Sequence, residues 1–189
     1  MGVVSIPSNL TPDGFTRIVG LDYAHGTNLY SAMCQFLSAD IDTSLNNVKS
    51  ESTAIQDFQG KQNTMILIEE LPKELTYSNT ALNFLQNYKV SGAEEIYWYI
   101  PALGELKSLL DYKSVINLTL TKLQSVYPSI VSKLTQEYPS ASSNFSMNCW
   151  SSTEYNNEYV WILYGVDDIF RRYYKTTTFA VRPFAQLDF

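Results

Sequence analysis

The chain has 189 residues and a formal net charge of −6, with 45% hydrophobic and 17% charged residues. This length favours one domain, and the apolar content is sufficient for one hydrophobic core. The acidic balance argues against a nucleic-acid partner, because proteins that bind nucleic acids usually carry a basic patch. No apolar run reaches the length of about 18 residues that a membrane helix needs, so we expect no membrane span.

The first expected elements are an extended leader at residues 1–14 and a strand at Phe15–Leu21. Prolines and an Asp-Gly turn punctuate the leader, whereas Phe15–Leu21 is rich in apolar and β-branched residues. We therefore place the domain at residues 15–189. The segment Asn28–Leu37 is compatible with either a helix or a strand, and Asp40–Asp57 is polar and expected to be loop.

The middle of the chain shows a helical period of apolar residues. Asn79 or Thr80 is a suitable N-cap, and Pro101 fits the first turn of a later helix. The expected helical segments are Met65–Glu70, a helix with Leu82, Leu85 and Tyr88 on one face that ends at Gly92, a helix marked by Leu103, Leu106, Leu109 and Leu110, its continuation through Ile116, Leu120 and Leu123, and a short segment at Ile130 and Leu134.

After a Ser-rich loop at Pro139–Asn144, the apolar period changes from helical to alternating, which indicates strands. The order along the chain is therefore a strand, a block of helices and a block of strands. This order predicts an α+β fold.

Residue types that carry catalysis are scarce. His25 is the only histidine, so a histidine-based triad and a multi-histidine metal site are excluded. Asp167 and Asp168 offer oxygen ligands for Ca²⁺, but two adjacent aspartates usually mark a turn. Cys34 and Cys149 are expected to be buried free thiols, with a disulfide between them left open. We expect no enzyme activity, no cofactor and no metal.

Several motifs together resemble a family of bacterial and phage C-type-lectin-like domains, and the resemblance covers residues 60–189. The matching motifs are G-K-Q-N-T at Gly60–Thr64, W-Y-I-P-A-L-G-E-L at Trp98–Leu106, W-S-S-T-E-Y at Trp150–Tyr155, and a closing pattern of Trp161, Lys175 and Val181–Pro183. The chain is similar to one group in this family, the variable proteins of diversity-generating retroelements. In that group an error-prone reverse transcriptase rewrites adenines in a C-terminal cassette, which corresponds here to residues 149–189.

The resemblance implies that the varied side chains bind ligands. The positions that it implies are Asn156, Asn157, Tyr159, Ile162, Tyr164, Val166, Asp167, Ile169, Arg171, Arg172, Tyr173 and Tyr174. Rewriting an Asn codon that ends in C cannot give Lys, Glu, Gln, Met or Trp. The stretch Ile162–Tyr174 lacks all five residue types, whereas Glu158 departs from the pattern.

Strand geometry favours the same surface. Side chains alternate along a strand, so if Trp161 points inward, Ile162 and Tyr164 point outward. Together with Phe170 and the tyrosine pair that follows it, they would form an exposed aromatic patch, which usually marks an interaction site. The alternative is that these aromatic residues are half-buried core.

The residues expected to stay fixed have structural roles in this interpretation. Trp150 and Trp161 are expected to anchor the core. Ser151, Ser152 and Thr153 are expected to satisfy backbone groups of a loop. Arg182 is expected to be buried against a carboxylate, with Glu154 and Glu105 as the two candidates.

The resemblance implies a C-type-lectin-like α+β domain, in which helices pack on a small twisted antiparallel sheet and the terminal strands lie close together. It implies binding of a protein or glycan ligand at a cell or virion surface, and an oligomer is compatible with it. One alternative is a structural subunit of a surface appendage or virion. Another is an enzyme of the formylglycine-generating type, with Cys149 as its nucleophile. Calcium-dependent sugar binding is not expected, because the Glu-Pro-Asn and Trp-Asn-Asp signatures of animal lectins are absent.

Overall fold

The computed structural model describes residues 4–12, 14–20, 34–89, 94–126, 148–164 and 168–187. Its strands are β1 (Val4–Ile6), β2 (Thr16–Val19), β3 (Cys34–Gln35), β4 (Asn148–Glu154), β5 (Tyr159–Tyr164), β6 (Ile169–Tyr174), β7 (Thr178–Phe179) and β8 (Phe184–Leu187). Its helices are α1 (Glu51–Ala54), α2 (Gly60–Glu70), α3 (Ala81–Asn87), α4 (Leu103–Asp111) and α5 (Lys113–Val126), with 3₁₀ turns η1 (Ser8–Leu10) and η2 (Pro72–Leu75). Along the chain, the helices come after one group of strands and before another, so the predicted α+β class is confirmed.

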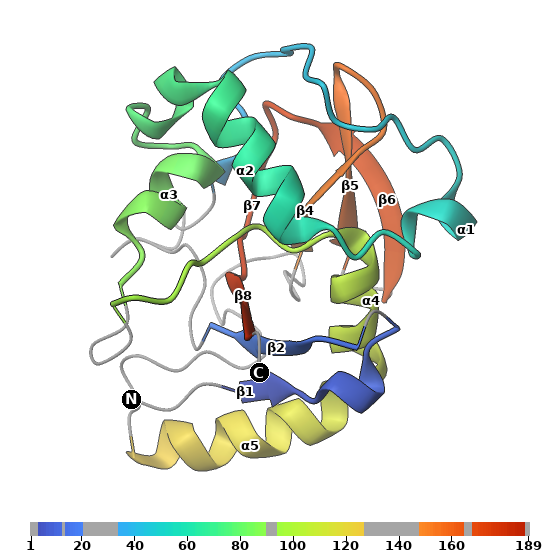
Figure 1. Ribbon diagram of the computed structural model, residues 1–189, viewed down its shortest axis with the longest axis vertical. Helices are drawn as coiled ribbons and strands as arrows, with labels where there is room; N and C mark the ends of the chain where they lie inside the picture. Colours follow the sequence, from blue (N-terminus) through green and yellow to red (C-terminus); the bar gives the residue numbers. More distant parts are fainter. Residues whose placement is uncertain are drawn as a thin grey trace, which may run out of the picture.

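The strands form three small antiparallel sheets with the orders β1-β2-β8, β3-β7 and β4-β5-β6. In Figure 1 the β4–β6 sheet lies in the upper half of the molecule, and the β1–β2–β8 sheet lies in the lower half above α5. Thr16 of β2 is opposite Leu187 of β8, so the expected closeness of the terminal strands is confirmed. Strand β1 lies within the expected leader 1–14, and it pairs with β2 in this sheet.

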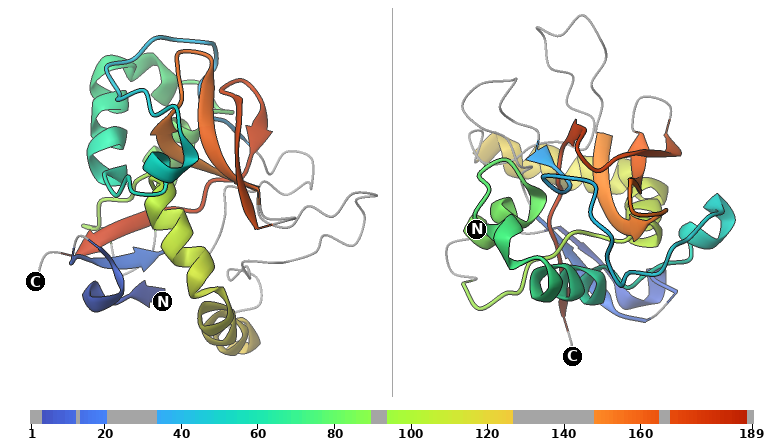
Figure 2. Two further views of the ribbon diagram at one scale, coloured as in Figure 1. Left: turned by 90° about the vertical axis from the view of Figure 1, so that its right-hand side faces the viewer. Right: turned by 90° about the horizontal axis from the view of Figure 1, so that it is seen from above.

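Both faces of β4 and β5 are buried, whereas the edge strand β6 is largely exposed. On one face Trp150 and Ile162 pack in a cluster that includes Leu67 of α2 and Leu82 of α3. On the other face Cys149 and Leu163 pack against residues of α4, α5, β2 and β8. The two views of Figure 2 show α2 and α3 beside this sheet, and α4 leading from it toward α5. The run of apolar residues in β5 follows from this two-sided burial, which is typical of a central layer.

Two helix starts show how local and tertiary signals compete. The side chain of Thr80 accepts a bond from the Asn83 N–H, so the predicted cap of α3 is confirmed. Pro101 lies before the N-cap residue of α4, and the prediction that it occupies the first turn is wrong. At that start the Leu103 N–H is bound by the hydroxyl of Thr153 at 2.8 Å. This cap comes from β4, 50 residues further along the chain, so local sequence does not reveal it.

The remaining predicted elements have mixed outcomes. Helix α2 begins at Gly60 rather than at Met65, and α3 ends at Asn87 rather than at Gly92. The expected loop at Asp40–Asp57 is confirmed except for the single turn of α1. The predictions for His25, Ile130, Leu134 and Pro139–Asn144 concern positions outside the described residues.

Two buried ion pairs tie distant segments together. The Arg17 Nε donates to the Glu105 carboxylate at 2.6 Å, and each side chain is 1% exposed. Lys175 is fully buried, pairs with Glu154 and donates to the backbone carbonyl of Ile41 at 2.9 Å. Glu105 and Glu154 were the carboxylates expected beside Arg182, and they pair with Arg17 and Lys175. Because burial removes water from these charges, each pair requires both partners.

We expect Lys175→Met to lower the free energy of unfolding by about 3 to 5 kcal/mol, because it leaves the Glu154 carboxylate buried without its cation. The matched control is Lys107→Met, since Lys107 pairs with Asp111 on the exposed surface of α4. An exposed pair of this kind contributes about 0.5 kcal/mol or less. Urea unfolding followed by circular dichroism measures both values. Equal losses in the two variants would contradict the special role of the buried pair.

Candidate functional site

Strand β6 forms one edge of the β4–β6 sheet, and it carries five of the twelve residues predicted to bind ligand. It pairs with β5 from Tyr159 opposite Tyr174 to Tyr164 opposite Ile169. Directly opposed residues of an antiparallel pair lie on the same face of the sheet. The predicted residues therefore fall into two groups, one on each face of this edge.

The first group gathers around the rings of Tyr155, Tyr159 and Tyr174. The rings of Tyr159 and Tyr174 lie 4.3 Å apart between centroids, and Tyr155 contacts Tyr159 edge to face at 6.4 Å. A hydrogen bond with Tyr174 raises the pKa of Tyr159 to about 12. Two cations lie over the Tyr155 ring, the guanidinium of Arg172 and the ammonium of Lys49, each 4.6 Å from its centroid. This group combines exposed aromatic area with positive charge.

The second group lies on the opposite face of the edge. The rings of Tyr164 and Tyr173 are parallel, with centroids 6.4 Å apart. The guanidinium of Arg171 lies 4.7 Å from the Tyr164 ring centroid. Ile169 follows on the same face, because it is opposite Tyr164, and it is 38% exposed. A ligand that reaches around the β6 edge can therefore contact both groups, whereas a flat ligand meets only one.

The turn between β4 and β5 places two predicted asparagines beside the first group. The Asn156 side-chain oxygen accepts bonds from the N–H groups of Glu158 and Tyr159, at 3.0 and 2.7 Å. Asn156 therefore shapes this turn, whereas Asn157 is exposed at its tip. Val166 and Asp167, also predicted to bind ligand, lie outside the described residues.

The predicted exposure of Ile162 is wrong. Its side chain is fully buried and packs opposite Trp150, in the cluster that includes residues of α2 and α3. Alternation along a strand exposes every second side chain only where one face of the sheet meets solvent, whereas both faces of β5 are covered. Phe170 and Tyr173, expected in the exposed patch, are half-buried against core clusters. The half-buried alternative therefore applies to these two residues.

Lys49 and Tyr155 were missed by the sequence analysis. Lys49 lies in the segment expected to be loop, and its ammonium also donates to the backbone carbonyl of Tyr155 at 2.7 Å. A single lysine in a polar segment carries no sequence signal for this contact. Tyr155 is the last residue of the W-S-S-T-E-Y motif, and this position was the signal in the sequence that could have placed Tyr155 at the site.

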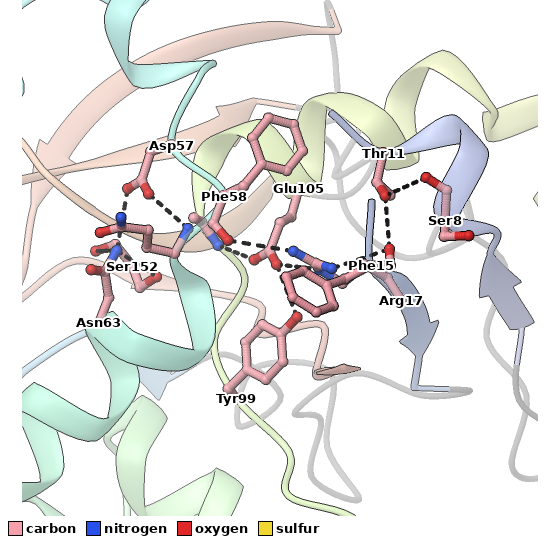
Figure 3. A network of polar contacts seen from close by, with 12 residues as sticks. Ser8, Thr11, Phe15, Arg17, Asp57, Phe58, Asn63, Tyr99, Glu105 and Ser152 are labelled. Carbon is pink, nitrogen blue, oxygen red and sulfur yellow. Dashed lines mark hydrogen bonds and ion pairs between the residues drawn. The ribbon is translucent and has the colours of Figure 1, made fainter. Parts of the chain in front are cut away.

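Largely buried polar contacts join β4 to α2, and α4 to β2. Figure 3 shows Asp57 beside Asn63 and Ser152, and Glu105 beside Arg17 and Tyr99. The Asp57 carboxylate accepts from the Asn63 amide at 3.2 Å and from the Thr153 hydroxyl at 2.7 Å. The G-K-Q-N-T and W-S-S-T-E-Y motifs therefore meet at one carboxylate.

The expected anchoring roles are confirmed. Trp150 is fully buried and Trp161 is 7% exposed, and their indole N–H groups donate to the carbonyls of Cys34 and Val48, each at 2.7 Å. The Ser151 hydroxyl donates to the carbonyl of Trp161 at 2.7 Å. The hydroxyls of Ser151 and Thr153 do satisfy backbone groups, whereas the Ser152 hydroxyl accepts from the Asn63 side chain, and all three residues lie in β4 rather than in a loop.

The surroundings of Gly60 explain why the first residue of the G-K-Q-N-T motif is glycine. A Cβ at this position would lie 2.2 Å from a carboxylate oxygen of Glu105 and 2.6 Å from the Ala102 nitrogen. Any larger residue would displace the Glu105 carboxylate, which accepts bonds from Arg17 and Tyr99. The motif glycine therefore permits close approach of α2 to the start of α4.

Groups that could support other chemistry are already engaged or buried. Asp168 pairs with Lys113 at 2.8 Å and has a φ of 55°, as expected for a turn. Within the described ranges, no group of three or more His, Cys, Asp or Glu side chains is arranged to hold a metal ion. Cys34 and Cys149 are free and buried, and burial raises the pKa of each thiol to about 12. The expectation of two buried free thiols is confirmed.

We expect both thiols to stay unreactive in the folded protein. Because burial raises the pKa of Cys34 and Cys149 above the ordinary value of 9.0, the unfolded chain releases these protons at a lower pH than the folded chain. Their contribution to stability is therefore complete below pH 9 and is lost as the pH rises toward 12. Iodoacetamide at pH 8, read by mass spectrometry, should label neither thiol until urea unfolds the chain.

The control for this prediction is Cys149→Ala, whose unfolding midpoint should fall less steeply above pH 9 than that of the unaltered chain. Labelling of either cysteine in the native protein, or identical alkaline profiles for the two chains, would contradict the prediction.

Comparisons with known proteins give one fold-level similarity. The structure is similar to the crystal structure of a fimbrial protein from Bacteroides ovatus, with a TM-score of 0.60 and 16% sequence identity. The similarity covers 90% of this chain and 35% of the fimbrial protein, so the chain spans about a third of that protein's length. No protein-family model matches the sequence, and no curated protein matches it. Among the described residues, no helix has the length and apolar character needed to cross a membrane.

Proposed function

We propose that this protein binds ligands through the β6 edge and the adjoining Tyr155–Tyr159 turn, as a receptor or adhesin at a cell or virion surface. The observation that carries the proposal is the concentration of Tyr and Arg side chains at this edge, outside the buried polar network. Tyr and Arg dominate binding hot spots, because they combine large rigid area with directed hydrogen bonds. The ligand is a protein or a glycan, and the protein has no catalytic role.

The proposed scaffold is a C-type-lectin-like domain of the kind used by variable proteins of diversity-generating retroelements. Support comes from the division between edge and interior. The motif residues Trp150, Trp161 and Lys175 are buried, whereas Asn157, Arg171 and Tyr174 are exposed. Rewriting the edge would change the ligand surface while the interior contacts remain.

A structural subunit of a surface appendage is the second candidate. The similar structure is that of a fimbrial protein. Helix α5 also exposes three apolar side chains on one side, Val115, Leu118 and Val126, which are 63%, 66% and 64% exposed. Assembly through α5 would bury them. An enzyme of the formylglycine-generating type is less favoured, because Cys149 is fully buried and its thiol pKa is raised to about 12.

Sequencing this locus in many related isolates tests the ligand-binding proposal. We expect substitutions to concentrate at exposed and half-buried cassette positions, because changes there alter the ligand surface and leave the core intact. The positions are Asn157, Tyr159, Tyr164, Ile169, Arg171, Arg172 and Tyr174. Trp150, Trp161, Lys175 and Arg182 should stay fixed.

Val115 and Leu118 are the matched control positions, because they are exposed but lie outside the cassette. If they vary as much as the β6 edge, the pattern is ordinary surface drift and the proposal fails. Ile162 gives a second check, since it lies within the cassette but is buried. Substitutions there should be confined to apolar residues of similar volume.

A further inference from the structure

Lys49, Tyr155 and Arg172 form a cationic cluster beside β6. They come from the loop before α1, from the residue after β4, and from β6 itself. The Lys49 ammonium and the Arg172 guanidinium each lie 4.6 Å from the Tyr155 ring centroid, so the two charges are no farther apart than twice that distance. Both cations are exposed, and Tyr155 is half-buried between the turn and the sheet.

Neither cation has an ion-pair partner within the part of the chain that the structure describes. Other surface lysines do have one, since Lys107 pairs with Asp111 and Lys113 pairs with Asp168. The two cations over the Tyr155 ring repel each other. The chain has a net charge of −6, so carboxylates that could neutralise such a pair are plentiful, yet none pairs with these cations in the part of the chain that the structure describes. The cluster therefore keeps positive charge available to a molecule from outside.

The geometry favours a carboxylate as the bound group. The planar guanidinium of Arg172 can donate two parallel bonds to the two oxygens of a carboxylate, and Lys49 adds a second charge. Contact with the Tyr155 ring restricts both long side chains, which lowers the entropy lost on binding. Tyr159 and Tyr174 flank the cluster with aromatic area that suits a protein side chain.

A protein partner suits this surface better than an acidic glycan. Strand β6 is an edge strand, and an extended peptide can pair with such an edge through backbone hydrogen bonds. Alternate side chains of that peptide would then reach the same face as Arg172. An acidic residue at one of these positions would meet the cluster.

We propose that the Lys49–Tyr155–Arg172 cluster binds a side-chain carboxylate of an extended acidic segment in a protein partner. This inference rests on the proposed ligand-binding function and adds the chemistry of the ligand. Lys49 and Tyr155 are new to the site, because the sequence-based set contains Arg172 alone of the three. Glu158 lies in the adjoining turn and is exposed, so it opposes the binding of an acidic group.

The test is an NMR titration of the full chain with N-acetyl tetraglutamate amide, with tetraglutamine as the neutral control. We expect saturable shifts of the Tyr155 ring and of the Lys49 and Arg172 side chains with tetraglutamate alone. Lys49→Gln and Arg172→Gln should each raise the Kd roughly tenfold, since each removes one charge-assisted contact. Both positions are exposed, so these variants should fold normally. Glu158→Gln should lower the Kd.

Lys107→Gln is the matched control, because it removes one surface charge from α4, which contributes no residue to the cluster. An equal effect in Lys107→Gln would mean diffuse attraction and would overturn the proposal, as would the absence of shifts at the three residues. Tighter binding of tetragalacturonate than of tetraglutamate would overturn the choice of a protein partner. If the peptide does not bind but substitutions among isolates still concentrate at β6, the ligand-binding function stands and only its acidic ligand fails.

Discussion

Burial of both faces of β4 and β5 is the constraint on which the arrangement of this protein depends. One face packs on α2 and α3, and the other packs on α4, α5 and the β1–β2–β8 sheet. Side chains of β5 are therefore committed to the core at Val160, Trp161, Ile162 and Leu163. Ligand contact from this sheet is left to the β6 edge and to the turn before β5. An antiparallel sheet usually offers one broad face to a ligand. Here the sheet is a central layer, so only a narrow edge, with its two sides, is available to a ligand.

The polar network gives this edge a fixed base. Asp57 joins Asn63 of α2 to Thr153 of β4, while Thr153 also caps α4. The Lys175–Glu154 pair connects the residue after β6 to the end of β4. Since Thr153, Glu154 and Lys175 are buried and Asp57 is half-buried, loss of one member leaves another polar group without its partner. Cooperative networks of this kind hold the strands in one register, and this register fixes the positions of the exposed side chains.

The sequence was sufficient for the fold class, for most helices and for the anchoring tryptophans, because these depend on local period and on residue type. It was insufficient where contacts between distant segments decide the outcome. Pro101 was misplaced because Thr153 caps α4 from another strand. Ile162 was assigned to the surface because alternation along β5 does not reveal how many layers cover the sheet. The W-S-S-T-E-Y motif ends at Tyr155 beside β6, whereas Lys49 reaches the Tyr155 ring only through the folded chain.

The same division between edge and interior would allow the proposed ligand surface to change without loss of the fold. A substitution at an exposed position away from buried features usually changes stability by about 0.5 kcal/mol or less. The loss of a buried charge partner costs several times more, because the remaining charge has neither water nor a counter-ion. Arg171 and Tyr174 belong to the first class, and Lys175, the residue directly after Tyr174, belongs to the second. Two adjacent residues at the end of β6 thus differ in their tolerance to substitution. Tyr174 tolerates substitution because its side chain is exposed, and Lys175 does not because its side chain is buried on the other side of the backbone.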